Sequence, residues 1–237
     1  MKQVNWALSL GIMALVAVLC AATANADLYV ETENVSTNIP HQPNGATTLK
    51  NYFTSKASRV ELGNGKVFIL DYGAMKMFTL DPKAKTYAEH NLGELEAAAP
   101  DMSGSDKQQI LNEAMAAILA VQVHPTDETK IIEGYRCRKF NVNVAMVKGE
   151  YWVSKDVKGY QELRTLGAKV ASVLDRNPML RQFNIAGMAE KLDGFPVYIV
   201  NHVLGGTVQT TLKDVKQRPL EPALFRVPKD YTLAGNK

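Results

Sequence analysis

The feature that most constrains the fold is a series of four short apolar segments separated by turn residues, within residues 57–92. The three breaks carry the sequences Gly63-Asn64-Gly65, Tyr72-Gly73-Ala74 and Asp81-Pro82-Lys83. These residue types supply the positive φ or the proline-fixed φ that tight turns between strands require. The series therefore predicts a β-meander, in which four strands pair in sequence order.

Side chains within the meander alternate between two faces, as strands require. In the first strand the two faces hold Ser58, Val60 and Leu62 on one side and Arg59 and Glu61 on the other. In the next strand Val67 and Ile69 oppose Phe68, Leu70 and Tyr72, so both faces are apolar. A strand that is apolar on both faces belongs inside a sheet with a cover on each side.

Residues 1–26 have the pattern of a secretory signal peptide. Lys2 precedes an uncharged apolar run, and Ala24-Asn25-Ala26 supplies the small residues of a cleavage site. The run of about 15 apolar residues is shorter than the roughly 20 that span a bilayer. Lipid modification of Cys20 is a competing interpretation, but Leu19 stands where a small residue is usual. We predict cleavage after Ala26, a periplasmic location and one domain over residues 27–237.

Composition argues against several classes of function. The formal net charge is +3, and acidic and basic residues are interspersed, so the sequence predicts no nucleic-acid partner. Cys137 is the only cysteine after residue 26, which leaves no internal disulfide; a buried thiol is favoured over a reactive one. The four histidines are widely separated, and no catalytic or haem-attachment motif surrounds them. We predict no enzymatic activity, no metal site and no cofactor.

The remaining segments extend the sheet and add helices. Residues 28–36 and 47–53 read as an opening pair of strands, with Leu28 and Val30 on one face of the first and Leu49, Asn51 and Phe53 on one face of the second. Helical spacing begins at a capping box at 105–108 and predicts a helix over residues 105–119. It returns in residues 159–187, where Asn177-Pro178 separates two helices.

Further strands are expected in residues 120–132, 134–144, 151–153, 197–204 and 207–215. Cys137 is out of phase with Phe140 in a period of two, which predicts a bulge or a twist between them. The fold class that follows is mainly β (α+β), a curved antiparallel sheet whose concave face is covered by the inserted helices.

Five ordered motifs resemble those of a known family. They are a segment from Arg59 to Lys85-Thr86-Tyr87, then Ile132-Glu133-Gly134-Tyr135-Arg136-Cys137-Arg138-Lys139-Phe140, Tyr151-Trp152-Val153-Ser154-Lys155-Asp156, Asp193-Gly194-Phe195-Pro196-Val197, and Leu224-Phe225-Arg226-Val227-Pro228-Lys229-Asp230-Tyr231. Together they are similar to the uncharacterised secreted relatives of the LolA/LolB-like periplasmic lipoprotein carriers. The resemblance implies an unclosed β-barrel of about eleven strands with a helical lid over an apolar cavity for acyl chains.

These features lead to the hypothesis of a periplasmic binding or carrier protein for a hydrophobic ligand, either a lipid or a lipoprotein acyl chain. The alternative is a cell-envelope protein-interaction or sensor module with no lipid ligand, and no transmembrane segment is expected after residue 26. The candidate cavity-lining residues are Val60, Leu62, Phe68, Leu70, Met75, Met77, Phe78 and Trp152. The resemblance adds Arg59 as a possible polar contact, because the carriers have a basic residue on an early strand.

Overall fold

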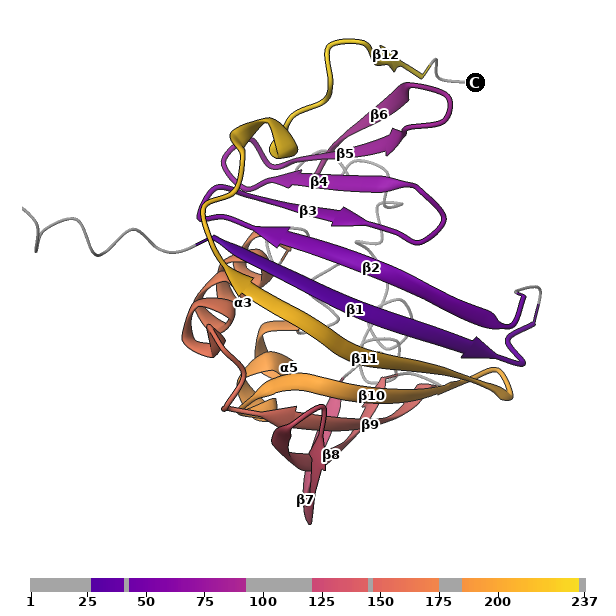
Figure 1. Ribbon diagram of the computed structural model, residues 1–237, viewed down its shortest axis with the longest axis vertical. Coiled ribbons are helices and arrows are strands. Elements are labelled where there is room, and N and C mark those ends of the chain that lie inside the picture. Colours follow the sequence, from indigo (N-terminus) through magenta and orange to yellow (C-terminus); the bar gives the residue numbers. More distant parts are fainter. Residues whose placement is uncertain (1–26, 41–42, 93–120, 145–146, 175–184, 235–237) are drawn as a thin grey trace, which may run out of the picture.

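The computed structural model describes residues 27–40, 43–92, 121–144, 147–174 and 185–234. Within these ranges the chain forms one continuous twelve-stranded sheet, with two helices against one of its faces (Figure 1). The predicted signal peptide, the predicted helix in residues 105–119 and the Asn177-Pro178 helix start lie outside the described residues.

The strands are β1 (Leu28–Thr37), β2 (Gly45–Phe53), β3 (Ala57–Glu61), β4 (Val67–Asp71), β5 (Lys76–Asp81), β6 (Thr86–Asn91), β7 (Gln122–Ile132), β8 (Tyr135–Val144), β9 (Val147–Ser154), β10 (Phe195–Val203), β11 (Gly206–Gln217) and β12 (Thr232–Leu233). The helices are α3 (Tyr160–Leu174) and α5 (Ile185–Leu192), with a short 3₁₀ turn, η2 (Pro222–Phe225). In space the strand order is β12-β6-β5-β4-β3-β2-β1-β11-β10-β9-β8-β7. The predicted class, a curved and unclosed antiparallel sheet with helices on its concave face, is confirmed.

Strands β3 to β6 form the predicted meander. In two of its turns, an aspartate side chain accepts backbone hydrogen bonds. Asp71 Oδ1 accepts a hydrogen bond from the backbone N–H of Gly73 at 2.9 Å, and Asp81 makes the equivalent turn after β5. Positive φ falls on Met75 (53°) and Lys85 (51°), not on Gly73. The side-chain cap therefore fixes the start of each turn, and the last residue of the turn takes the left-handed conformation.

Helix α3 closes one end of the concave face. Its Leu163 and Leu166 pack in one buried cluster with Leu28 and Val30 of β1. Farther along the sheet, Leu192 of α5 joins a second cluster formed by side chains of β8 and β9. The alternating apolar residues of the strands and the helical spacing of residues 160–174 thus meet in a common core.

The opposite, outer face of the meander is covered by residues 218–234, which we call the C-terminal strap (yellow in Figure 1). Val227 and Tyr231 of the strap pack against Val67, Ile69 and Leu80. The strap ends in β12, which pairs in parallel with β6, and the backbone N–H of residue 234 donates to the carbonyl of residue 87 at 2.7 Å. The strap therefore covers the outer face of the doubly apolar strand β4, whereas on the inner face Leu70 packs in a cluster with Val170 of α3.

The irregularity expected near Cys137 lies in the neighbouring strand. The register of β7 against β8 shifts between Pro125 and Thr129, while the β8–β9 register runs without a shift from Arg138 to Val144. Three residues of β7 therefore lie opposite Lys139, and the bulge belongs to β7.

Candidate functional site

Cross-strand partners share a face, so the register sorts the side chains of the sheet into parallel rows. The first row on the concave face contains Leu28, Phe53, Ser58, Leu70 and Met77, and the second contains Val30, Asn51, Val60, Phe68 and Thr79. The third row begins with Thr32 and Leu49, and the fourth with Asn34 and Thr47. Neighbouring rows are two residues apart along the strands, or roughly 7 Å.

The first row is closed by α3. Leu28 and Phe53 pack with the leucines of the helix, and Leu70 and Met77 pack in a cluster that includes Val170 of α3. Both ends of this row therefore belong to the core of the protein.

The rows beyond it carry three of the predicted site residues. Val60 and Phe68 are direct partners, and Leu62 follows at the alternating position after Val60. All three side chains are half-buried, yet among the described residues none belongs to the four apolar clusters. An apolar strip thus continues across the concave face past the part that α3 packs.

Two more predicted residues have different settings. Met75 lies in the turn before β5 and packs on the cluster of Tyr72 and Leu92, so it does not share a strand with Met77. Trp152 of β9 packs against the cluster around Leu28, far along the sheet order from the meander. Five of the predicted site residues therefore share the concave face of the meander, and Trp152 lies apart from them on β9. The five are Val60, Leu62, Phe68, Leu70 and Met77.

The register places Arg59 and Phe78 on the outer face, because each is a direct partner of Ile69. Phe78 packs under the strap. The Arg59 side chain donates from Nη1 to the carbonyl oxygen of Leu224 at 3.0 Å and pairs through Nε with Glu61 at 2.9 Å. Arg59 therefore ties the strap to the sheet, on the face opposite Val60.

Asn34 is a residue of the concave face that sequence patterns did not single out. Its Oδ1 atom is buried and has no hydrogen-bond partner among the residues that the structure describes. Its direct partners are Thr47 of β2 and Thr210 of β11. Alternation along β1 places Asn34 on the same face as Leu28 and Val30, but nothing in the sequence marks its oxygen as unpaired.

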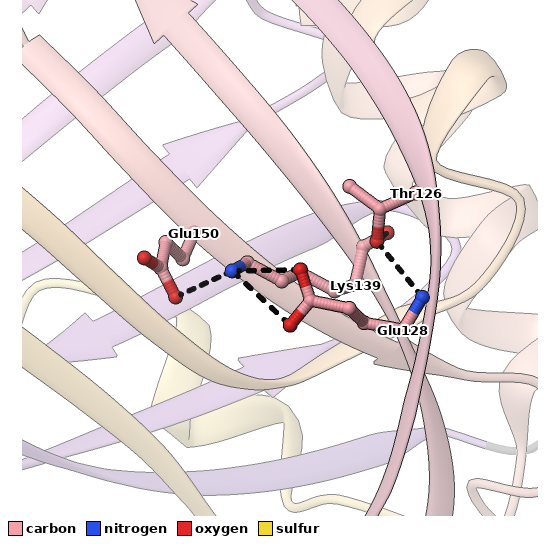
Figure 2. Close-up of polar contacts among 4 residues, drawn as sticks. All are labelled: Thr126, Glu128, Lys139 and Glu150. Carbon is pink, nitrogen blue, oxygen red and sulfur yellow. Dashed lines mark hydrogen bonds and ion pairs between the residues drawn. The ribbon is translucent and has the colours of Figure 1, made fainter.

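A polar cluster lies around the bulge in β7, where Figure 2 shows Lys139 between two glutamates. Its Nζ is 3.2 Å from Glu128 Oε1 and 3.3 Å from Glu150 Oε2, and it lies 5.8 Å from the centre of the Trp152 ring. Thr126 Oγ1 donates to the carbonyl of Lys139 at 3.0 Å and accepts from the N–H of Glu128 at 3.2 Å. These contacts explain how the bulge directs Glu128 toward Lys139.

Two surface pockets lie away from the concave strip. One, with a volume of about 380 Å³, adjoins the Lys139 cluster; its lining residues are Asn141, Asn143, Lys148, Gly149, Glu150 and His202. The other, of about 420 Å³, lies between the strap and the turn after β2, where Asp27 Oδ2 accepts the N–H of Leu220 at 2.9 Å. Both have mixed polar linings, so neither resembles the predicted acyl cavity.

The described part of the chain offers few groups that could bind a metal ion or act as a nucleophile. No group of three or more histidine, cysteine, aspartate or glutamate side chains there could hold a metal ion, and no helix there is long and apolar enough to cross a membrane. Cys137 is a free thiol, 1% exposed, and burial raises its pKa above the ordinary cysteine value. A raised pKa disfavours the nucleophilic thiolate, in agreement with the interpretation of a buried thiol.

Comparisons with known proteins were made on the sequence and on the fold. A family model described as "Domain of unknown function (DUF4412)" matches residues 35–231. A comparison with curated protein sequences finds no match.

Among solved structures, PNGF-II aligns with a TM-score of 0.40 and 12% identity, over 88% of this chain and 31% of that one. The chain thus spans about a third of the length of PNGF-II. The lipoprotein LppX of Mycobacterium tuberculosis aligns with a TM-score of 0.38 and 11% identity, over 92% of this chain and 99% of LppX. A LolA superfamily protein from Nitrosomonas europaea aligns with a TM-score of 0.34 and 10% identity, over 85% and 90% of the two chains. The resemblance to LolA-like proteins is found again here, but scores this low carry no argument about activity.

Proposed function

We propose that this chain, which belongs to the DUF4412 family, is a binding or carrier protein for a hydrophobic ligand such as a lipid or a lipoprotein acyl chain. The observation that carries the proposal is the apolar strip of Val60, Leu62 and Phe68 on the helix-covered face of the sheet. These side chains are half-buried but lie outside the apolar clusters formed by the described residues. Binding then requires no reaction, because burial of methylene groups supplies the free energy.

The strength of such binding follows from its area. Each buried methylene contributes roughly 0.8 kcal/mol, so a medium-length alkyl chain gains several kcal/mol on a shallow apolar surface. The floor of the site is supported from behind, because the strap packs on Val67 and Ile69 of β4 and accepts a hydrogen bond from Arg59 of β3 through the carbonyl of Leu224. A preformed floor lowers the ordering cost of binding. In this proposal the sheet provides the contact area, and export to the periplasm would bring the protein to its ligand.

The test is native mass spectrometry of the protein recovered gently from the exporting cell, followed by extraction of any bound molecule. We expect an associated mass that matches a fatty acid, phospholipid or acylated peptide. The variant Val60→Lys places a charge in the strip and should lower ligand occupancy at least about tenfold, because a charge buried against an alkyl chain is costly. Ile131→Lys is the matched control, since Ile131 is 73% exposed on β7 and should not affect occupancy.

Two results would contradict the proposal. One is a ligand-free mass together with no uptake of added palmitate or phospholipid by the wild-type protein. The other is equal occupancy in wild type and Val60→Lys, which would locate the ligand elsewhere. In the first case, the interaction-module hypothesis would become the leading explanation for the family fold.

A further inference from the structure

The surface pocket of about 420 Å³ between the strap and the turn after β2 combines an apolar wall with charges of both signs. Its volume is within the range of pockets that hold small molecules. Two hydrogen bonds hold the strap against the sheet beside it. The N–H of Leu220 donates to Asp27 Oδ2 at 2.9 Å, and the carbonyl of Leu224 accepts from Arg59 Nη1 at 3.0 Å. The walls of the pocket are therefore fixed by the fold.

The apolar wall comes from the strap, through Leu220, Pro222 and Phe225. Leu220 is buried, whereas Phe225 is half-buried. Among the described residues, Phe225 belongs to none of the four apolar clusters. Its ring is thus available to an apolar group of a ligand, which gains free energy when it leaves water.

Two cations line the pocket from opposite walls, Lys56 from the turn and Arg226 from the strap. Both are exposed, and in the described part of the chain neither side chain forms an ion pair or a hydrogen bond. Asp71 is the direct partner of Ala57, the residue after Lys56, yet Asp71 and Lys56 do not pair. The cations are therefore not neutralised by the carboxylates that share the pocket with them.

Those carboxylates, Asp27 and Asp71, are held by backbone donors. Asp27 Oδ2 accepts the N–H of Leu220, and Asp71 Oδ1 accepts the N–H groups of Gly73 and Ala74, each at 2.9 Å. Within the described residues the second oxygen of each, Asp27 Oδ1 and Asp71 Oδ2, has no hydrogen bond. One oxygen of each carboxylate thus fixes its position, and the other is left for a ligand.

We propose that this pocket binds a zwitterion with an apolar side chain, namely a free apolar amino acid or a short apolar peptide. Its ammonium group donates to Asp27 and Asp71, and its carboxylate pairs with Lys56 and Arg226. Its side chain packs on Phe225. A fatty acid supplies only the carboxylate and leaves the two aspartates without a donor, so this pocket differs from the apolar strip in ligand as well as in place. The inference does not rest on the proposed function.

The experiment is isothermal titration calorimetry on the protein recovered from the exporting cell. It compares leucine and leucyl-leucine with their N-acetylated and C-amidated forms. The free form that binds more tightly should bind at least about tenfold better than either of its blocked forms, because each block removes one charge-assisted contact.

Two variants assign the charges. Asp71→Asn should weaken binding of the free form about tenfold without weakening that of the N-acetylated form. Asp81→Asn is the matched control, because Asp81 Oδ1 accepts the N–H groups of Lys83 and Ala84 in the same kind of turn, away from the pocket. Asparagine keeps an acceptor oxygen for either turn.

Arg226→Gln should likewise weaken binding of the free form about tenfold without weakening that of the C-amidated form. Its control is Lys229→Gln, which removes an exposed cation from the same strap outside the pocket.

Several results would overturn the inference. Failure of wild type to bind either leucine or leucyl-leucine would do so and would leave the proposed function intact, because that function depends on the strip. Equal affinity for free and blocked forms would show that the charges do not select the ligand. Equally tight binding of glycerophosphoethanolamine would point to a lipid headgroup, and equal effects of Asp71→Asn and Asp81→Asn would locate the site elsewhere. The ligand comparison on wild type needs no variant.

Discussion

Lys139 shows how one side chain can hold two neighbouring strands at an irregular position. Its ammonium group lies between Glu128 of β7 and Glu150 of β9, and its side chain is 14% exposed. The bulge in β7 brings Glu128 within reach of Lys139. Their ion pair links the two strands where the bulge interrupts the regular backbone hydrogen bonds. Since both glutamates are well exposed, the pairs contribute modestly to stability.

We expect Lys139→Met to lower the free energy of unfolding by about 1 kcal/mol, because the aliphatic stem is retained while two half-exposed ion pairs are lost. The loss should shrink in 1 M salt, which screens the charges. The control is Lys155→Met, which removes a single, more exposed pair with Asp193 and should change stability by less than about 0.5 kcal/mol. Urea titrations at two salt concentrations measure both; an equal loss in the two variants would contradict the assignment.

The same cluster predicts a pH dependence. The hydrogen bond with Glu128, followed by that with Glu150, raises the pKa of Lys139 above its ordinary value. A lysine whose folded pKa is raised stabilises the folded state below its unfolded pKa, and that stabilisation is lost as the pH rises through the folded pKa. The difference in stability between wild type and Lys139→Met should therefore be constant at neutral pH and should decrease above about pH 10.4. A difference that disappears between pH 7 and 9 would contradict this assignment.

At the scale of elements, α3 has two glycines, of which one is required by the local structure and the other is not. Gly159 precedes the helix with φ +74°, and a Cβ there would lie 2.9 Å from Leu28 Cδ2. Its carbonyl accepts the N–H of Leu163 at 2.9 Å, so Gly159 begins the first turn. Gly167 lies inside α3, and a Cβ there would meet open space. The first glycine permits the close approach of helix and β1, whereas the second only weakens the helix.

We expect Gly159→Ala to destabilise the protein by about 1–2 kcal/mol, through strain at positive φ and the clash with Leu28. Gly167→Ala should stabilise it by about 0.5–1 kcal/mol, because alanine has the higher helix propensity. The midpoint of urea denaturation gives both values. An unchanged or raised stability in Gly159→Ala would show that the start of α3 does not constrain β1.

The C-terminal strap is the element that completes the second cover of β4. Tyr231→Ala should cost about 1–2 kcal/mol, since its ring packs on the buried cluster of Val67, Ile69 and Leu80. Leu233→Ala should change stability by less than about 0.5 kcal/mol, because that side chain is 61% exposed. Thermal denaturation distinguishes them, and an unchanged melting temperature in Tyr231→Ala would mean that the strap is not part of the folded core.

Some elements were predictable because their signals are local. Alternation in β3 and β4 and the spacing of apolar residues in α3 depend only on neighbours in the chain, and both predictions were confirmed. The strap was not predicted as a cover, because its two-residue strand pairs with β6 through contacts distant in sequence. A bulge or a twist was expected between Cys137 and Phe140 of β8, and the register shift lies in β7 opposite Lys139, since the period of one strand does not show which partner holds the extra residues.

The candidate site was predictable only in part, because it too depends on contacts between segments that are distant in sequence. Alternation separated Val60 from Arg59, but which face is concave depends on where α3 packs. Phe78 was grouped with Met77 although adjacent strand residues point to opposite faces. Asn34 gave no composition signal, because only the assembled sheet reveals that its buried oxygen lacks a partner among the described residues.

At the scale of the whole molecule, one sheet runs from β12 to β7 without interruption. The predicted single domain therefore implies a single cooperative unfolding transition. After the predicted cleavage at Ala26, Trp152 is the only tryptophan and reports on β9, whereas far-ultraviolet circular dichroism reports on the entire sheet. We expect the two urea transitions to coincide. A fluorescence midpoint that differs from the dichroism midpoint would show that β7–β10 unfold separately from the meander.

The pairing of β1 with β11 at the middle of the sheet sets the order of events during synthesis. Leu28 of β1 pairs with Gln217 of β11, so the first of the described strands finds its second neighbour only after β11 has been made. Until then, β1 presents an open edge beside a partly formed meander, and such edges promote misassembly. Pairing across so long a separation is also slow, because the loop must close before the contact forms. A nascent chain of this fold therefore passes through a long vulnerable period, during which protection by a chaperone would matter most.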